Sequence, residues 1–109
     1  MKRMFASSAL ALVMVLLSQH AAAEAVGRVV AVGCHNTDNV CWVEVEGFTG
    51  SPACGTSYQL RWDAGTAWGN RWYATLLAAK ASGNRVRLEI ASYCSAQGYP
   101  TFLYGSVID

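Results

Sequence analysis

The sequence is poor in charge, proline and histidine. Charged residues make up 14% of the 109, against about 25% in an average soluble protein. Two residues are proline and two are histidine. The chain also lacks a Gly-rich phosphate loop, an H-E-x-x-H motif and a G-x-S-x-G motif. These absences disfavour the common classes of metalloprotease, serine hydrolase and nucleotide-binding enzyme, and the length predicts a single domain.

Basic residues form no stripe or block. The chain has eight basic and seven acidic residues, and two of the basic ones, Lys2 and Arg3, lie at the N-terminus. Binding to nucleic acid through neutralised phosphates is therefore disfavoured, as is a polybasic patch for a membrane surface. We expect no nucleic-acid partner.

The longest apolar run lies near the N-terminus. Lys2 and Arg3 precede the run at residues 9–17, and small residues at 21–23 follow it. This pattern is typical of a secretory signal peptide over residues 1–23. The run is too short for a membrane span, which needs about 20 apolar residues. We expect residues 24–109 to form a secreted or periplasmic domain without a membrane span; an uncleaved amphipathic anchor is the alternative.

The predicted domain contains four cysteines: Cys34, Cys41, Cys54 and Cys94. An even count in a short exported chain indicates two disulfides. Three pairings are open, and we favour Cys34–Cys41 with Cys54–Cys94, because the first pair lies at the top of a predicted hairpin. A zinc site that includes His35 is the alternative, but the sequence has no paired Cys-x-x-Cys. We predict neither a metal nor another cofactor.

Hydrophobic periodicity predicts five strands and one helix. The strands are expected at residues 26–32, 40–46, 57–62, 86–91 and 99–108, with a loop at 47–55. The helix is expected at 67–82, with Asp63 or Thr66 as its N-cap and Gly83 at its end. The order β-β-β-α-β-β is that of the OB-fold, a partly open five-stranded barrel. The fold class is therefore mainly β with one helix (α+β), with an OB-like barrel favoured over an α+β roll.

The helix carries an aromatic stripe. Trp68, Trp72, Leu76 and Ala79 recur at helical spacing, which predicts a face buried against the sheet. The alternative is that Trp68 and Trp72 stack on a ligand.

Side chains suited to catalysis are sparse. His35 is the single histidine after the signal segment, and a lone histidine in a turn is usually a surface residue. Glu44 and Glu46 share a strand face, where we expect them to meet solvent or to pair with Arg61 or Arg87. We therefore predict that the protein is not an enzyme.

Aromatic residues are abundant, and they favour binding. The chain has four Trp, five Tyr and three Phe, more than so small a barrel can bury. Trp42 shares its strand face with acidic residues, as in many sugar-binding or protein-binding surfaces, unless a loop or the helix covers that face. Turn residues Thr37, Asp38 and Asn39 lie at the barrel end where OB-folds often bind ligands, although a turn alone explains them. The predicted ligand site consists of Thr37, Asp38, Asn39 and Trp42.

Several short motifs resemble the B subunits of subtilase-cytotoxin and typhoid-toxin type. The matching segments are 41–43 (CWV), Cys54, 68–77, 82–90 (SGNRVRLEI) and 99–100 (YP). The helix end LLAAKASG is also similar to that of small exported bacterial proteins. The resemblance implies an OB-fold, a ring pentamer, a sialylated glycan as ligand and a toxin A subunit as partner. It also implies a sugar contact at Thr37, where the family usually has serine, and a Cys41–Cys54 disulfide, which leaves Cys34 and Cys94 to pair.

Together these features predict an exported, non-enzymatic binding module that recognises a glycan or another cell-surface group. The alternative is a periplasmic structural or inhibitory protein that binds another protein.

Overall fold

The computed structural model describes residues 24–109, so the predicted signal peptide at residues 1–23 lies outside the described residues. The elements follow the chain in this order: β1 (Glu24–Cys34), β2 (Val40–Val45), β3 (Gly50–Ser51), β4 (Gly55–Thr56), β5 (Leu60–Asp63), α2 (Ala67–Ser82), β6 (Arg85–Cys94) and β7 (Pro100–Val107). No helix in this range has both the length and the hydropathy that crossing a membrane requires.

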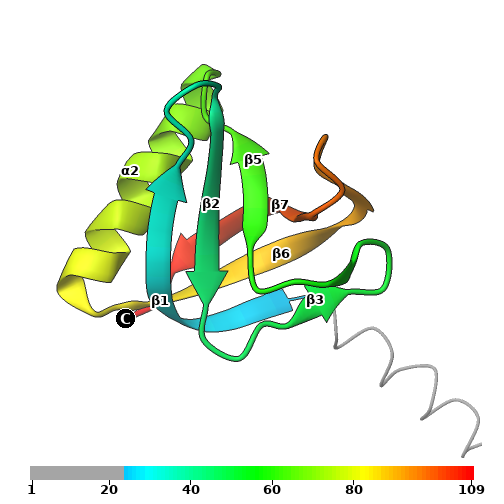
Figure 1. The fold of residues 1–109 in the computed structure, drawn as a ribbon. Helices are drawn as coiled ribbons and strands as arrows, with labels where there is room; N and C mark the ends of the chain where they lie inside the picture. The colour runs from blue at the N-terminus through cyan, green and yellow to red at the C-terminus, as the bar shows by residue number, and fades with distance from the viewer. Residues whose placement is uncertain (1–23) are drawn as a thin grey trace, which may run out of the picture.

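Five of the strands form one antiparallel sheet in the order β5-β2-β1-β6-β7, and β3 pairs with β4 in a separate hairpin. The long strand β1 pairs with β6 through its first half and with β2 through its second half. A register shift between Val29 and Ala31 separates the two halves. In Figure 1, β6 and β7 cross behind β1, β2 and β5, and α2 lies beside β1. The sheet is not closed, but Trp62 of β5 meets Phe102 of β7 edge to face, with ring centroids 5.4 Å apart.

The core lies between the sheet and α2. Val43, Leu60 and Leu76 are fully buried there, from β2, β5 and α2 respectively. Val86 and Leu88 of β6 are equally buried. The alternation predicted for residues 40–46 and 86–91 is therefore confirmed in β2 and β6, because their inward positions are apolar and their outward positions are exposed or half-buried. In the third predicted strand Leu60 is buried, but Tyr58 is exposed and precedes β5.

The predicted helix is confirmed, with the same bounds. The Thr66 hydroxyl accepts a hydrogen bond from the Gly69 amide at 2.9 Å, so Thr66 is the N-cap. Gly83 ends the helix at φ 71°, a left-handed conformation that glycine adopts without a steric penalty. Local sequence signals therefore determine both ends of α2.

The predicted strand limits needed correction. The first and fourth strands are longer than expected, because β1 pairs with two partners and β6 continues beside β7 as far as Cys94. The segment 47–55, predicted as a loop, contains β3 and the start of β4. The third strand begins at Leu60 rather than at residue 57, because the Ser57 hydroxyl accepts a hydrogen bond from the Gln59 amide and makes a local turn.

The predicted helical stripe is also wrong at one end. Leu76 and Ala79 are buried and Trp72 is half-buried, but the Trp68 side chain is 65% exposed. The buried residue of the first turn is Gly69, which lies so close to the Asp63 carbonyl that a Cβ atom would overlap it. Each helical residue turns about 100° from its neighbour, so a buried Gly69 directs Trp68 away from the core.

Replacing Gly69 by alanine tests this close approach. Alanine normally stabilises a helix interior by about 1 kcal/mol relative to glycine. Here the added Cβ would overlap the Asp63 carbonyl, and overpacking costs about 1–3 kcal/mol. We expect a lower free energy of unfolding in urea. Asn70→Ala, at the next and exposed helix position, is the control and should not destabilise. A stabilised Gly69→Ala variant would contradict the close approach.

The C-terminal residue Asp109 fastens the end of the chain to β6. Its carboxylate accepts hydrogen bonds from the Arg85 guanidinium at 2.6 and 2.9 Å and from the Arg85 amide at 3.1 Å. These hydrogen bonds from the Arg85 side chain hold the pKa of Asp109 below its usual value. The ionised carboxylate is therefore the form that the fold favours.

The resulting pH dependence has a definite sign. Because the pKa of Asp109 is lower in the folded chain, its contribution to stability is present above the unfolded-state pKa and is lost as the pH falls through the folded-state pKa. We expect Asp109→Asn to lower the thermal unfolding midpoint at neutral pH. The difference from the parent protein should disappear in acid, where both side chains are neutral. Glu46→Gln, at an exposed carboxyl without an ion pair in residues 24–109, should show no such difference.

Candidate functional site

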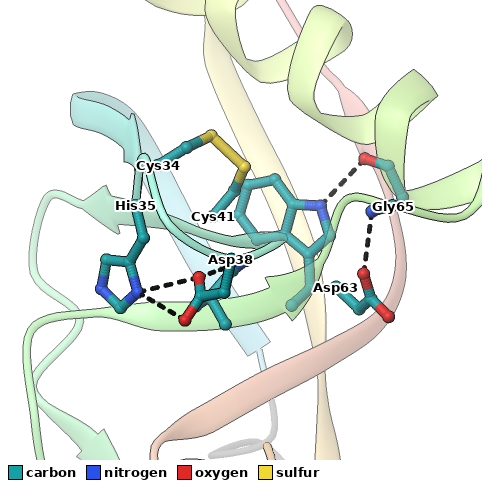
Figure 2. Close-up of a disulfide and its surroundings, with 9 residues drawn as sticks. Cys34, His35, Asp38, Cys41, Asp63 and Gly65 are labelled. Atoms are coloured by element: carbon teal, nitrogen blue, oxygen red, sulfur yellow. Dashed lines mark hydrogen bonds and ion pairs between the residues drawn. A yellow bond between two sulfur atoms is a disulfide. The ribbon is translucent and has the colours of Figure 1, made fainter.

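Two disulfides frame the region that the sequence singles out. Cys34–Cys41 joins directly paired residues of β1 and β2, as Figure 2 shows. Cys54–Cys94 joins the β3–β4 turn to the end of β6. The favoured pairing is confirmed, and the Cys41–Cys54 pairing implied by the toxin resemblance is wrong, because the residue opposite Cys41 in the sheet is Cys34. With all four sulfurs bonded, none is a thiolate that could hold zinc.

The predicted site residues Thr37, Asp38 and Asn39 lie in the turn between β1 and β2. The Asp38 carboxylate accepts a hydrogen bond from the Val40 amide at 3.0 Å and lies 3.1 Å from His35 Nδ1 (Figure 2). The amide hydrogen bond, with the His35 contact second, lowers the pKa of Asp38. Asp38 is therefore a turn-forming residue, and its side chain is 51% exposed.

The two residues beside Asp38 lie differently. Thr37 is exposed, and its side chain makes no hydrogen bond with the rest of the described chain. The Asn39 carbonyl accepts a hydrogen bond from the Ala64 amide at 2.8 Å, and its side chain packs against Gly65. Asn39 therefore links the turn to the segment that leads into α2.

Trp42 belongs to β2, the strand that follows this turn. It is paired with Gly33 of β1, and its indole fills the space above that glycine: a Cβ atom there would lie 2.5 Å from Trp42 Cζ2. The His35 ring is tilted beside the indole, with centroids 5.7 Å apart. Trp42 is half-buried as a result, with part of the indole open to solvent. Trp42 is therefore close to the turn, because its ring lies beside that of His35.

The next strand adds a group that the sequence did not single out. Arg61 of β5 is paired with Trp42, so both side chains leave the same face of the sheet. Its Nε donates a hydrogen bond to Gln59 Oε1 at 3.0 Å, and its guanidinium carbon lies 3.6 Å from the centre of the Tyr99 ring. This geometry is a cation–π contact. We call the surface formed by Trp42, Glu44, Gln59, Arg61 and Tyr99 the outer face.

Glu44 and Glu46 were expected to meet solvent or to pair with Arg61 or Arg87, and neither forms an ion pair within residues 24–109. Arg61 does not form an ion pair with Glu44 within residues 24–109, because Gln59 and Tyr99 hold its guanidinium. Arg87 instead lies 3.7 Å from Glu24. Glu46 lies beyond the end of β2 and is exposed.

Two cavities flank the stack of Arg61 on Tyr99. One measures about 440 Å³ and is lined in part by Glu44, Ser57, Tyr58, Gln59 and Tyr99. The other measures about 500 Å³ and is lined in part by Asn39, Arg61, Tyr93, Ser95 and Gln97. Cys54 lines the first and Cys94 the second, so their disulfide forms part of both walls.

This arrangement offers chemistry for recognition. Its aromatic rings provide flat apolar surface, and its amides, hydroxyls, arginine and carboxylate provide directional hydrogen bonds. His35 is the single histidine in residues 24–109. It contacts Asp38 at the surface and lines neither cavity. Tyr99 is distant from Arg61 in the sequence, so only the folded chain reveals the stack. The alternation of the third strand does place Gln59 and Arg61 together on its outer side.

No family model, curated protein or solved structure matches the chain. The likeness to the toxin B subunits therefore stays a prediction from short motifs.

The two disulfides should contribute unequally to stability. Their cysteines are 7 and 40 residues apart, and the stabilisation from closing a loop rises with its length. Chain entropy gives about 2.5 kcal/mol for the short loop and about 4 kcal/mol for the long one. We expect the double variant Cys54→Ser/Cys94→Ser to lose more free energy of unfolding in urea than Cys34→Ser/Cys41→Ser. The reverse order would contradict the loop-entropy explanation.

Proposed function

We propose that this protein is a non-enzymatic binding module whose outer face recognises a carbohydrate. The observation that carries the proposal is the Arg61 guanidinium held over Tyr99 and beside Gln59, between two cavities. A sugar ring has an apolar C–H face that stacks on aromatic rings and a rim of hydroxyls that needs paired donors and acceptors. The outer face offers both kinds of partner within one surface.

The sheet order supports an OB-like fold for this module. The helix lies between the third and fourth strands of the main sheet, and the third and fifth strands are at its edges. OB-folds bind oligonucleotides and oligosaccharides on their second and third strands and on the loops after the first and fourth. In this chain those places are β2, β5 and the loops 35–39 and 95–99, which adjoin the outer face.

Charge favours a sugar over a nucleic acid as the ligand. The outer face carries one arginine beside Glu44, and Asp38 lies close enough for Arg61 to lower its pKa further. Phosphate backbones need several clustered basic groups. We also include Thr37, Asp38, Asn39 and Trp42 in the proposed site, because the turn and the strand that carry them lie next to Arg61.

A location outside the cytoplasm completes the proposal. Two disulfides are typical of the periplasm or the extracellular space, in keeping with the signal peptide predicted from the sequence. The toxin resemblance adds a ring pentamer and a toxin A subunit as proposed partners.

A second candidate function, binding to another protein, is favoured by β7. This strand is at the edge of the sheet and has no charged residue. Leu103, Tyr104 and Val107 are exposed on it. Natural proteins usually protect an open edge with charge, so an uncharged one suits a partner strand. A monomer in light scattering and no copurified partner would remove this candidate.

A glycan array followed by titration calorimetry tests the carbohydrate proposal. We expect Arg61→Lys to weaken binding about tenfold or more, because lysine keeps the charge but loses the planar fork of donors. Trp42→Leu should also weaken binding. Leu77→Ser, at an exposed helix position, is the control and should bind like the parent protein. The proposal fails if no glycan binds, or if the Arg61 and Trp42 variants bind as tightly as the parent.

A further inference from the structure

A third cavity shares Trp62, Asp63 and Tyr93 with the second one. It measures about 370 Å³ and lies between the first turns of α2 and strand β7. Six of the residues that line it have large apolar or aromatic side chains: Trp62, Trp68, Trp72, Tyr93, Phe102 and Leu103. We call it the aromatic cavity. Its volume falls within the range of about 300–1,000 Å³ that is typical of small-molecule sites.

Three rings form a rigid part of its wall. Phe102 meets Trp62 and Trp72 edge to face, with centroids 5.4 and 5.3 Å apart. The Trp62 indole N–H donates a hydrogen bond to the Gly69 carbonyl at 2.9 Å, which fixes its ring against α2. Because these half-buried rings hold one another in place, the cavity is preformed.

Two further rings in the wall are largely exposed. The Trp68 side chain is 65% exposed and that of Tyr93 is 59% exposed. They come from α2 and β6, respectively. Neither ring adds much to the core, so both are available to enclose a ligand.

The charge of this cavity is negative. Asp63 is the one charged residue in its lining, and it forms no ion pair within residues 24–109. One carboxylate oxygen accepts the Gly65 amide at 2.8 Å, which holds the side chain in place (Figure 2). The faces of aromatic rings are also negative, so the rings and the carboxylate favour the same kind of ligand.

We propose that the aromatic cavity binds an alkylammonium group. A quaternary ammonium has an apolar surface that fits between aromatic rings and a positive charge that these rings and Asp63 attract. The group can belong to a free small molecule such as choline or to a phosphocholine headgroup. This inference does not rest on carbohydrate binding, because it concerns another ligand and depends on Trp68 and Trp72, which line neither cavity beside the outer face.

Arg71 provides a test of the sign of the interaction. It lies in a shallow depression that shares Trp68 and Trp72 with the aromatic cavity, but it does not line the cavity itself. Its positive charge opposes a bound cation at short range and is screened by salt. Removing this charge should therefore strengthen the binding of a cation and leave a neutral ligand unaffected.

The first measurement compares two probes that differ in charge. Choline and its neutral isostere 3,3-dimethylbutan-1-ol are titrated into the purified protein, with the indole N–H signals followed by NMR. We expect choline to bind more tightly by about tenfold and to shift the Trp68 signal. Equal binding of the two probes overturns the inference, because it would mean that the cavity recognises only apolar surface. Failure of choline to bind overturns it as well.

Variants then assign the binding to these residues. Trp68→Leu keeps an apolar side chain but removes the ring, and should weaken choline binding about fivefold to thirtyfold. Trp68→Phe should restore most of the loss. Asp63→Asn keeps the acceptor for Gly65 and should also weaken binding, whereas Arg71→Gln should strengthen it. Unchanged choline binding in both Trp68→Leu and Asp63→Asn overturns the inference, and Leu77→Ser is the matched control on the exposed side of α2.

The source of the ammonium group is resolved with three ligands: choline, phosphocholine and phosphatidylcholine vesicles. Binding of choline alone identifies a free small molecule as the source, and binding of choline together with the vesicles identifies a lipid headgroup. Vesicle binding without choline binding, like binding of none, overturns the inference. A negative result here and a negative glycan array are read with different ligands, so failure of one proposal is distinguishable from failure of the other.

Discussion

The hydrogen bonds of β1 to two different strands hold this small domain together. Its first half pairs with β6 and its second half with β2, and the register shift between Val29 and Ala31 allows the strand to serve both. Without this shared strand, β2 and β5 would have no connection to β6 and β7 through the sheet. Each proposed binding surface combines a residue of β5 with a residue of β7 or of the loop before it. These pairs are Arg61 with Tyr99, and Trp62 with Phe102.

Local signals predicted much of the fold, because they act over a few residues. Thr66 and Gly83 define the helix through cap geometry, and the alternation of apolar residues identified β2 and β6. The Cys34–Cys41 disulfide followed from the hairpin, whose two strands bring these residues opposite each other. These features depend on chain segments that are adjacent in the sequence.

The candidate site was predicted less completely, because it depends on contacts between distant segments. The turn residues and Trp42 were identified, but the group at the centre of the outer face pairs Arg61 with Tyr99 from a loop near the C-terminus. Periodicity could also not show that Trp68 is exposed. It gives the spacing of a stripe, whereas the close approach of Gly69 to the Asp63 carbonyl determines which side of the first helical turn faces inward.

This close approach also explains how a domain with a small core can present large aromatic side chains. A glycine at the buried position lets the start of α2 lie directly against the end of β5, so Trp68 is not needed to fill the core. The two disulfides supply stability that a core of this size would otherwise have to provide. The backbone contact at Gly69 and the two disulfides thus leave the Trp68 side chain largely exposed, where it lines the aromatic cavity.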